Sequence, residues 1–287
     1  MKQILSVGRA VPAFNFINLE SWQAITAAVR ETGKPVLLAA STSAIKYMGD
    51  EFARFVAAGD LPVHLDHGAT MDDIKKAIGL GFKSVMIDGS HLSLEENIAL
   101  TREAVEYAHS HDVVVEGELG TIGGVEDERA SDSIIYTRPE DAVRFVRETG
   151  VDSLAIAIGT SHGAFKTQVK REPGEPILRF DILRAIRAVL PNTPLVLHGA
   201  STIPEKYTKV LGMNAAGGIP EDEMREAVRL GINKINVDSD ARLAFMATIK
   251  TEMAANPDKF DPRFFLGAAR KEMTEYYKHS IGMIAGA

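Results

Sequence analysis

The sequence predicts an α/β fold, a (β/α)8 barrel with a C-terminal helical extension. Two observations favour it: short apolar runs alternate with amphipathic helical segments along the chain, and eight such runs occur. Alternating strands and helices favour a parallel sheet with helices outside it, and eight units favour closure into a TIM barrel. Because no linker or shift in composition divides residues 1–287, we expect a single domain.

Each predicted strand is a run of β-branched and other apolar residues that ends in small or polar residues. Between these runs, the spacing of apolar residues changes to that of amphipathic helices. The eight runs are Val11–Phe16, Pro35–Ser41, Pro62–Asp66, Ser84–Asp88, Val113–Glu118, Ser153–Gly159, Pro194–His198 and Ile232–Val237.

Helical segments follow these strands. The segment that opens at Asp72 places Ile74, Ala77 and Ile78 on one face, and Gly81 suits its C-terminal end. The other segments that we predict as helices before the extension are Leu94–His109, Pro139–Thr149, Asp181–Leu190 and Pro220–Leu230.

Two parts of the chain fall outside the repeating pattern. Residues 240–287 follow the eighth strand, and we expect helices over Asp240–Ala254 and Pro262–His279 there. The connection between Glu118 and Pro139 is rich in glycine and acidic residues, and connections of this length are uncommon. We therefore expect either a lid over the site or a solvated surface loop.

Composition excludes several classes of protein. The chain has no cysteine, so disulfides, thiolate nucleophiles and Cys-ligated zinc are excluded, and a metal must be held by His, Asp or Glu. The formal charge is −7 without a basic block, so we expect no nucleic acid partner. Apolar runs fall short of the roughly 18 residues that a membrane helix needs. The N-terminus lacks the apolar stretch of a signal peptide, and we expect a cytoplasmic protein.

Three histidines stand at equivalent places after three different strands. His67, His162 and His198 follow the third, sixth and seventh predicted strands, and glycine follows each of them. Active sites of such barrels lie at the C-terminal ends of the strands. One such histidine alone would more often be structural, but three converging imidazoles are typical of a zinc site with an open fourth position.

Carboxylates stand beside these histidines. Asp66 precedes His67 directly, where it could transfer protons or orient an imidazole. Strict alternation along a strand would point the two side chains to opposite faces, so both reach the site only if the strand ends near Asp66. Asp88 and Glu118 end neighbouring strands and could supply oxygen ligands or a second metal position, or accept hydrogen bonds from loop amides.

The loops after the seventh and eighth strands commonly form the phosphate site of these barrels. Here they are Gly199-Ala200-Ser201 and Asn236-Val237-Asp238-Ser239. Small residues expose backbone amides, and serine and asparagine add donors, so the pattern predicts a substrate that carries phosphate. Ordinary turn chemistry is the alternative explanation.

Several ordered motifs resemble one family, the class II fructose-bisphosphate and tagatose-bisphosphate aldolases. The resemblance spans almost the whole chain and includes Asp261-Pro262-Arg263 in the extension. The motifs are Val11-Pro12-Ala13-Phe14-Asn15, Leu65-Asp66-His67-Gly68, Met86-Ile87-Asp88-Gly89-Ser90, Glu118-Leu119-Gly120, Gly123-Gly124-Val125-Glu126-Asp127, Ile158-Gly159-Thr160-Ser161-His162-Gly163 and Leu197-His198-Gly199-Ala200-Ser201.

The resemblance implies a metal set and two catalytic groups. It implies that His67, His162 and His198 bind Zn²⁺, with Asp88 and Glu118 at an alternative or second divalent position, and it allows a monovalent cation as well. Asp66 would be the acid/base at the C4 hydroxyl, and Glu126 would move the C3 proton.

The same resemblance implies the substrate contacts. Arg263 resembles an arginine that reaches the distal phosphate bound by a neighbouring subunit, which implies a homodimer or homotetramer. Thr202 departs from the family pattern, where many relatives carry glycine. The remaining positions implied to contact substrate are Asn15, Ser41, Gly163, Gly199, Ser201, Asn236, Asp238 and Ser239, with Ala200 and Val237 within the same loops.

The function implied is reversible cleavage of fructose 1,6-bisphosphate to dihydroxyacetone phosphate and glyceraldehyde 3-phosphate. Tagatose 1,6-bisphosphate or another ketose phosphate is the alternative substrate. A Schiff-base aldolase would need a lysine such as Lys166 or Lys234. A metal-dependent hydrolase or a sugar-phosphate binding protein is a further alternative.

Overall fold

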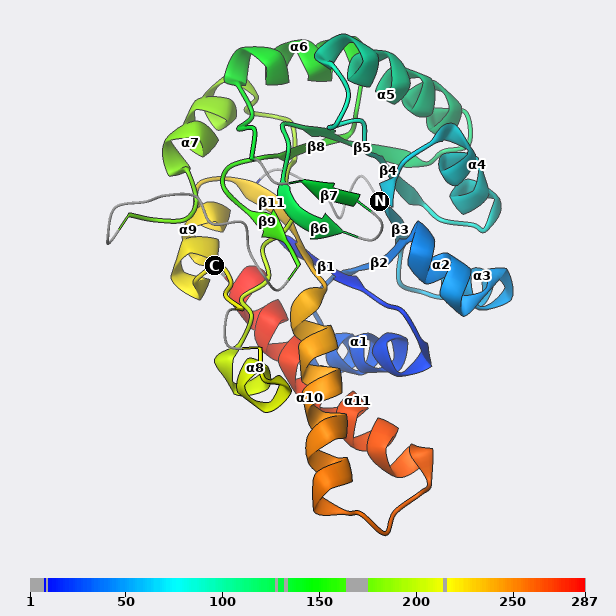
Figure 1. Ribbon diagram of the computed structural model, residues 1–287. Coiled ribbons are helices and arrows are strands. Elements are labelled where there is room, and N and C mark those ends of the chain that lie inside the picture. Colours follow the sequence, from blue (N-terminus) through cyan, green and yellow to red (C-terminus); the bar gives the residue numbers. More distant parts are fainter. Residues whose placement is uncertain are drawn as a thin grey trace.

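Eight parallel strands close into a barrel in this computed structural model, and helices surround it (Figure 1). The structure describes residue 8 and residues 10–126, 129–131, 134–163, 175–213 and 216–286. Around the barrel the strands run in the order β1-β11-β10-β8-β5-β4-β3-β2. The predicted α/β barrel is therefore confirmed.

Each predicted strand overlaps one strand of the barrel. Most of these residues are fully buried, because barrel strands are covered by helices outside and by packed side chains inside. The barrel strands are β1 Val11–Asn15, β2 Leu37–Ser41, β3 Val63–Gly68, β4 Ser84–Ile87, β5 Val114–Leu119, β8 Ser153–Ile156, β10 Leu195–Leu197 and β11 Ile232–Val237.

The helices begin at strong capping signals. Asn18, Thr70 and Ser93 each form a capping box at a helix N-terminus. None of the helices in the described ranges is both long and apolar enough to span a membrane. The helices are α1 Leu19–Thr32, α2 Thr42–Met48, α3 Asp50–Ala57, α4 Met71–Gly79, α5 Leu94–His109, α6 Pro139–Thr149, α7 Phe180–Val189, α8 Glu205–Leu211, α9 Glu221–Arg229, α10 Ser239–Ala255 and α11 Pro262–Ile284.

The long connection after β5 is more ordered than its composition predicts. Strand β6 (Gly123–Glu126) pairs antiparallel with β7 (Arg129–Ser131) and parallel with β9 (Ser161–His162), and this small sheet lies across one end of the barrel (Figure 1). Gly124 has φ +93°, and a Cβ there would lie 2.4 Å from the carbonyl oxygen of His162. Glycines in this connection suggested a loop, but Gly124 is required because β6 packs closely against β9.

The C-terminal extension is a helical hairpin whose second arm returns to the barrel. Helix α10 leads away from the barrel, and α11 comes back to lie beside α1 (Figure 1). Helix α11 is five residues longer than predicted because Ile281, Met283 and Ile284 are buried.

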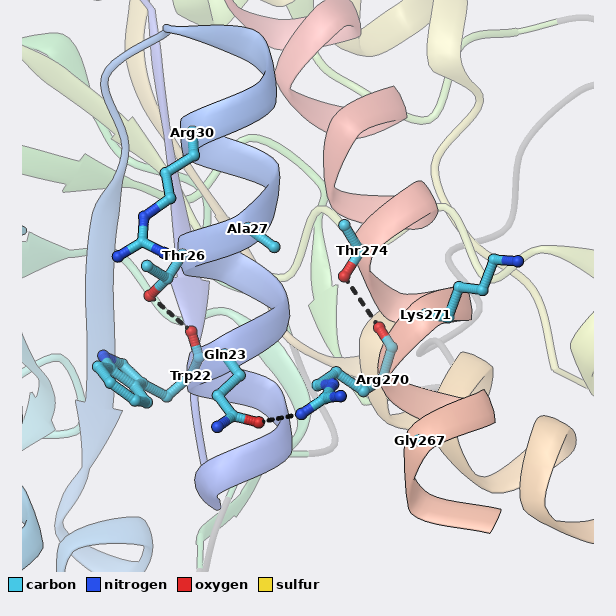
Figure 2. A pocket seen from close by; sticks show the side chains of 9 residues that line it. All are labelled: Trp22, Gln23, Thr26, Ala27, Arg30, Gly267, Arg270, Lys271 and Thr274. Carbon is cyan, nitrogen blue, oxygen red and sulfur yellow. Dashed lines mark hydrogen bonds between the residues drawn. The ribbon is translucent and has the colours of Figure 1, made fainter. Parts of the chain in front are cut away.

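A groove of about 610 Å³ separates α1 from α11 and is bridged by a hydrogen bond from Arg270 to Gln23 (Figure 2). Arg30 and Lys271 line the groove but point to opposite sides of it (Figure 2). The side chains of Arg30 and Lys271 therefore do not converge on a common point.

Candidate active site and metal centre

Asp66 and His67 both face the site although they are neighbours in sequence. Strand β3 continues to Gly68, so the expectation that the strand ends near Asp66 is wrong. Instead, His67 has φ +49°, and the pairing of β3 with β4 shifts register between Leu65 and Gly68. This bulge turns His67 to the same side as Asp66, and a left-handed conformation in a residue other than glycine persists only where its surroundings impose it.

Two imidazoles of the predicted metal set are in direct contact. His67 Nε2 lies 3.1 Å from His198 Nδ1. The second nitrogen of each ring faces a carboxylate: His67 Nδ1 is 3.1 Å from Asp88 Oδ2, and His198 Nε2 is 2.7 Å from Glu116 Oε1. These hydrogen bonds assign an N–H to each of the outer nitrogens, so the inner pair is left facing each other.

A proton or a metal ion must lie between His67 Nε2 and His198 Nδ1, because two nitrogen lone pairs at 3.1 Å would repel each other. Burial, with the charges of His67 and Lys234, lowers the pKa of His198, which is therefore a neutral acceptor. Burial also lowers the pKa of His67, but the hydrogen bond to Asp88 and the charge of Asp66 outweigh it and raise the pKa to about 9. Without a metal, a proton on His67 occupies this gap. A tetrahedral zinc ion holds two nitrogens about 3.3 Å apart, which the observed spacing fits.

His162 lies on β9, and its ring is near those of His67 and His198. Its ring centroid is 5.0 Å from that of His67 and 6.4 Å from that of His198, and the His67 and His198 centroids are 4.6 Å apart. Three imidazoles on one tetrahedral zinc have ring centroids about 5 Å apart. Among the described residues, His67 and His198 form a group with Asp66 whose single ligand atoms all lie within 4.8 Å of one another, and His162 is not in this group. The set of three histidines on one ion therefore stays a prediction.

The predicted second position lies on the other side of His67. Asp88 Oδ1 accepts a hydrogen bond from the Ser90 amide at 3.0 Å, while Glu118 Oε2 is buried without a hydrogen-bond partner. Burial and the charge of Asp88 raise the pKa of Glu118 to about 8. Single ligand atoms of His67, Asp88 and Glu118 lie within 4.8 Å of one another. An orphaned buried carboxylate oxygen in such a group fits a cation.

Asp66 is held by two amides. Asn15 Nδ2 donates to Asp66 Oδ2 at 2.7 Å, and Asn236 Nδ2 donates to Asp66 Oδ1 at 2.8 Å. Burial raises the pKa of Asp66, but the charges of His67 and Lys234 and the hydrogen bond from Asn15 outweigh this effect, so its pKa lies below the ordinary value. Asp66 is therefore a carboxylate, fixed in orientation, that lies beside the imidazole pair.

The loop after β10 requires glycine at its start. Gly199 has φ +62°, and a Cβ there would lie 2.8 Å from the carbonyl carbon and oxygen of Ser161. Gly163 follows β9 with φ +74°. The side chain of Ala200 is buried in the core, and Ser201 is almost fully buried. A ligand at this loop would therefore contact mainly its backbone groups.

Predicted substrate-binding residues in the loop after β11 and at the end of β2 make packing contacts and hydrogen bonds within the fold. The Val237 side chain packs in the core, and Asp238 accepts a hydrogen bond from Arg242 Nε at 2.7 Å. Ser239 is the first residue of α10. Ser41 ends β2, and its hydroxyl accepts a hydrogen bond from the Ala44 amide, which caps α2.

Two predicted residues remain, Glu126 and Arg263. The backbone of Glu126 belongs to β6, and its side chain lies outside the described part of the structure. Arg263 is 89% exposed on the projecting hairpin and pairs with Asp261 of its own chain at 2.6 Å.

Sequence reasoning missed a buried polar layer beneath the imidazoles. Glu116 Oε2 is 2.7 Å from Lys234 Nζ, which is 3.1 Å from His64 Nε2. These three side chains are at most 1% exposed. The signal was present, because each precedes a site residue by two positions on its strand and so faces the barrel interior with it. The pairs are His64 with Asp66, Glu116 with Glu118, and Lys234 with Asn236.

The fold and this cluster define a (β/α)8-barrel protein with a candidate metal centre at the strand ends. The whole chain, residues 1–287, matches the family described as class-II fructose-bisphosphate aldolase. It is 43% identical to the fructose-bisphosphate aldolase of Treponema pallidum, over 98% of this chain and 92% of that protein. It is 42% identical to that of Thermus caldophilus, over 97% and 93%.

Among solved structures, the chain resembles the YdjI aldolase of Escherichia coli K12, with a TM-score of 0.75 and 28% identity over 96% of this chain and 91% of that one. The protein belongs to the class-II fructose-bisphosphate aldolase family, whose members are metal-dependent lyases.

Proposed function

We propose that this protein cleaves fructose 1,6-bisphosphate reversibly to dihydroxyacetone phosphate and glyceraldehyde 3-phosphate, with Zn²⁺ held by His67, His162 and His198. The observation that carries the proposal is the 3.1 Å contact between His67 Nε2 and His198 Nδ1, whose outer nitrogens are fixed by carboxylates. Zinc bound there would polarise the substrate carbonyl and stabilise negative charge on its oxygen.

Asp66 is proposed as the acid/base at C4. In the cleavage direction, its carboxylate takes the proton of the C4 hydroxyl as the C3–C4 bond breaks and the electron pair stays on C3. In condensation it returns that proton to the aldehyde oxygen. The low pKa of Asp66 supports the first role, because the carboxylate is free to accept a proton at neutral pH.

Glu126 is proposed to deliver a proton to C3 after the bond breaks and to remove it in the reverse reaction. Its backbone supports this role, because β6 pairs with β9, the strand that carries His162. A carboxylate on a segment over the barrel end could also exclude water while the intermediate carries charge.

The substrate phosphate is proposed to bind backbone amides of Gly163 and the Gly199–Ser201 loop, with Asn236, Asp238 and Ser239 nearby. Asp88 and Glu118 are proposed as a second divalent position, and a monovalent cation and a cytoplasmic location stay predictions from the sequence.

A homodimer or homotetramer is proposed because Arg263 is exposed beside Phe260, which is 94% exposed on the same hairpin turn. Arg263 of one subunit would then meet the distal phosphate bound by another.

The test is metal removal followed by zinc titration, with triose phosphates detected in a coupled assay. We expect EDTA-treated protein to lose cleavage of fructose 1,6-bisphosphate and one equivalent of zinc to restore it. His67→Ala should lose zinc, whereas His111→Ala, at an exposed helix end, should keep it. Full activity after metal removal, or trapping of substrate on Lys234 by borohydride, would overturn the proposal.

Side-by-side turnover of fructose and tagatose 1,6-bisphosphates then decides the substrate. We expect the fructose sugar to be cleaved with the higher kcat/KM. The reverse order would assign the chain to tagatose 1,6-bisphosphate, without changing the roles proposed for the metal ligands or Asp66.

A further inference from the structure

The loop after β10 contains a strained residue. Ile203 has φ +52°, and a β-branched side chain in the left-handed region is a genuine outlier. Such a conformation persists only where neighbouring groups impose it, and it is often found beside functional sites. Ile203 ends the segment Gly199–Ile203, which begins at the glycine packed against Ser161.

Asp240 imposes this conformation from one side. It lies in the first turn of α10, is fully buried, and accepts hydrogen bonds from both amides at the end of the loop. Its Oδ1 is 2.7 Å from the Ile203 nitrogen, and its Oδ2 is 2.8 Å from the Thr202 nitrogen. The Thr202 hydroxyl adds a third bond at 2.9 Å, which gives the threonine a structural role in the loop.

Backbone packing confines the loop from the other side. The Ile219 amide donates to the Ser201 carbonyl at 3.0 Å. A Cβ on Gly218 would lie 2.2 Å from the Thr202 carbonyl, so no other residue fits there without movement. The loop is thus held between a buried carboxylate and a close backbone contact.

Tyr276 connects this arrangement to the C-terminal helix. Its hydroxyl, on α11, donates to Asp240 Oδ2. Burial and the charge of Asp240 raise the pKa of Tyr276 well above the ordinary value, so the hydroxyl stays a donor. The phenol is the fourth donor to Asp240, and it comes from an element that follows the barrel in sequence.

We propose that Asp240 and Tyr276 are positioning residues that hold the Gly199–Ile203 loop in the shape that binds the substrate phosphate. This inference rests on the proposed function, because it takes that loop as the phosphate site. It assigns the returning helix α11 a role in substrate affinity, separate from the proton transfers at C3 and C4.

The test compares Tyr276→Phe with Tyr277→Phe. The Tyr277 hydroxyl is buried on the same helix without a hydrogen-bond partner, so its removal takes away no bond. We expect Tyr276→Phe to raise KM for fructose 1,6-bisphosphate about 10-fold, as loss of a hydrogen bond to a charged group suggests, with kcat changed less than about twofold. Calorimetry on the zinc-loaded protein should show a matching loss of affinity for inorganic phosphate.

Amide hydrogen exchange supplies a readout that does not depend on turnover. Peptides that contain Thr202 and Ile203 should exchange faster in Tyr276→Phe than in Tyr277→Phe. Asp240→Asn should enlarge every effect, because its amide nitrogen would face backbone donors. If Asp240→Asn does not fold, Tyr276→Phe decides the matter alone.

Three results would overturn the inference: unchanged exchange in the loop of Tyr276→Phe, faster exchange with unchanged phosphate affinity, or an equal rise of KM in Tyr277→Phe. A wild-type protein that binds phosphate through an ordered loop but does not cleave fructose 1,6-bisphosphate would sink the proposed function and leave the positioning role supported.

Discussion

Replacing Glu116 by glutamine perturbs the metal centre through a residue that would not touch the metal. Glu116 Oε1 accepts from His198 Nε2, and its Oε2 accepts from Lys234 Nζ, each at 2.7 Å. A glutamine amide has one oxygen that can accept and one NH2 group that can only donate, so it cannot accept hydrogen bonds from both His198 and Lys234 through separate atoms. If its oxygen turns to the lysine, its amide N–H meets His198 Nε2, which favours the tautomer with the proton on Nδ1, the nitrogen needed for zinc.

Two magnitudes follow from this geometry. Loss of a partner that orients a metal-binding histidine weakens metal affinity about 10–100-fold, or about 1.4–2.7 kcal/mol. Glu116 and Lys234 are both almost fully buried, and removing one charge of a buried pair destabilises a protein by about 3–5 kcal/mol. We therefore expect Glu116→Gln to lose both zinc affinity and free energy of unfolding.

The assay is zinc competition against a fluorescent chelator, paired with urea unfolding of the metal-free protein. The double variant Glu116→Gln/Lys234→Met is the control, because glutamine can then turn its oxygen to His198. It should regain part of both losses. Wild-type zinc affinity in Glu116→Gln would refute the argument that Glu116 fixes the His198 tautomer.

Three further outcomes are expected. Asp66→Ala should lower kcat for cleavage by about 10²–10⁴-fold while one zinc is retained, as metal analysis and the coupled assay would show; near-full turnover would contradict the acid/base role. Zinc affinity, measured in competition titrations, should rise about tenfold per pH unit up to pH 9. The reason is that His67, whose pKa is about 9 without metal, must lose its proton to bind the ion. A zinc affinity that does not change between pH 7 and 9 would contradict this role of His67. Gly199→Ala should lower the unfolding free energy by about 1–3 kcal/mol in urea titrations, because its Cβ would meet the Ser161 backbone at φ +62°, and unchanged stability would show that the loop can move aside.

Local signals in the sequence were sufficient for the barrel. Eight apolar runs and the helices between them matched barrel elements closely, because burial on both faces leaves a continuous apolar pattern in each strand. Local signals failed where distant strands meet. The glycines near Gly124 suggested a loop, but they allow β6 to lie against β9, a contact between segments about 40 residues apart in the chain.

The sequence by itself determined that Asp66, His67 and His198 lie at one end of the barrel, since the C-terminal ends of parallel strands must meet at one end of a closed barrel. Only the tertiary structure decided how they are arranged there. The positive φ of His67 turns it to the side of Asp66, and Glu116 orients His198 from across the barrel. These features depend on contacts between strands far apart in the chain, which no local pattern of residue types encodes.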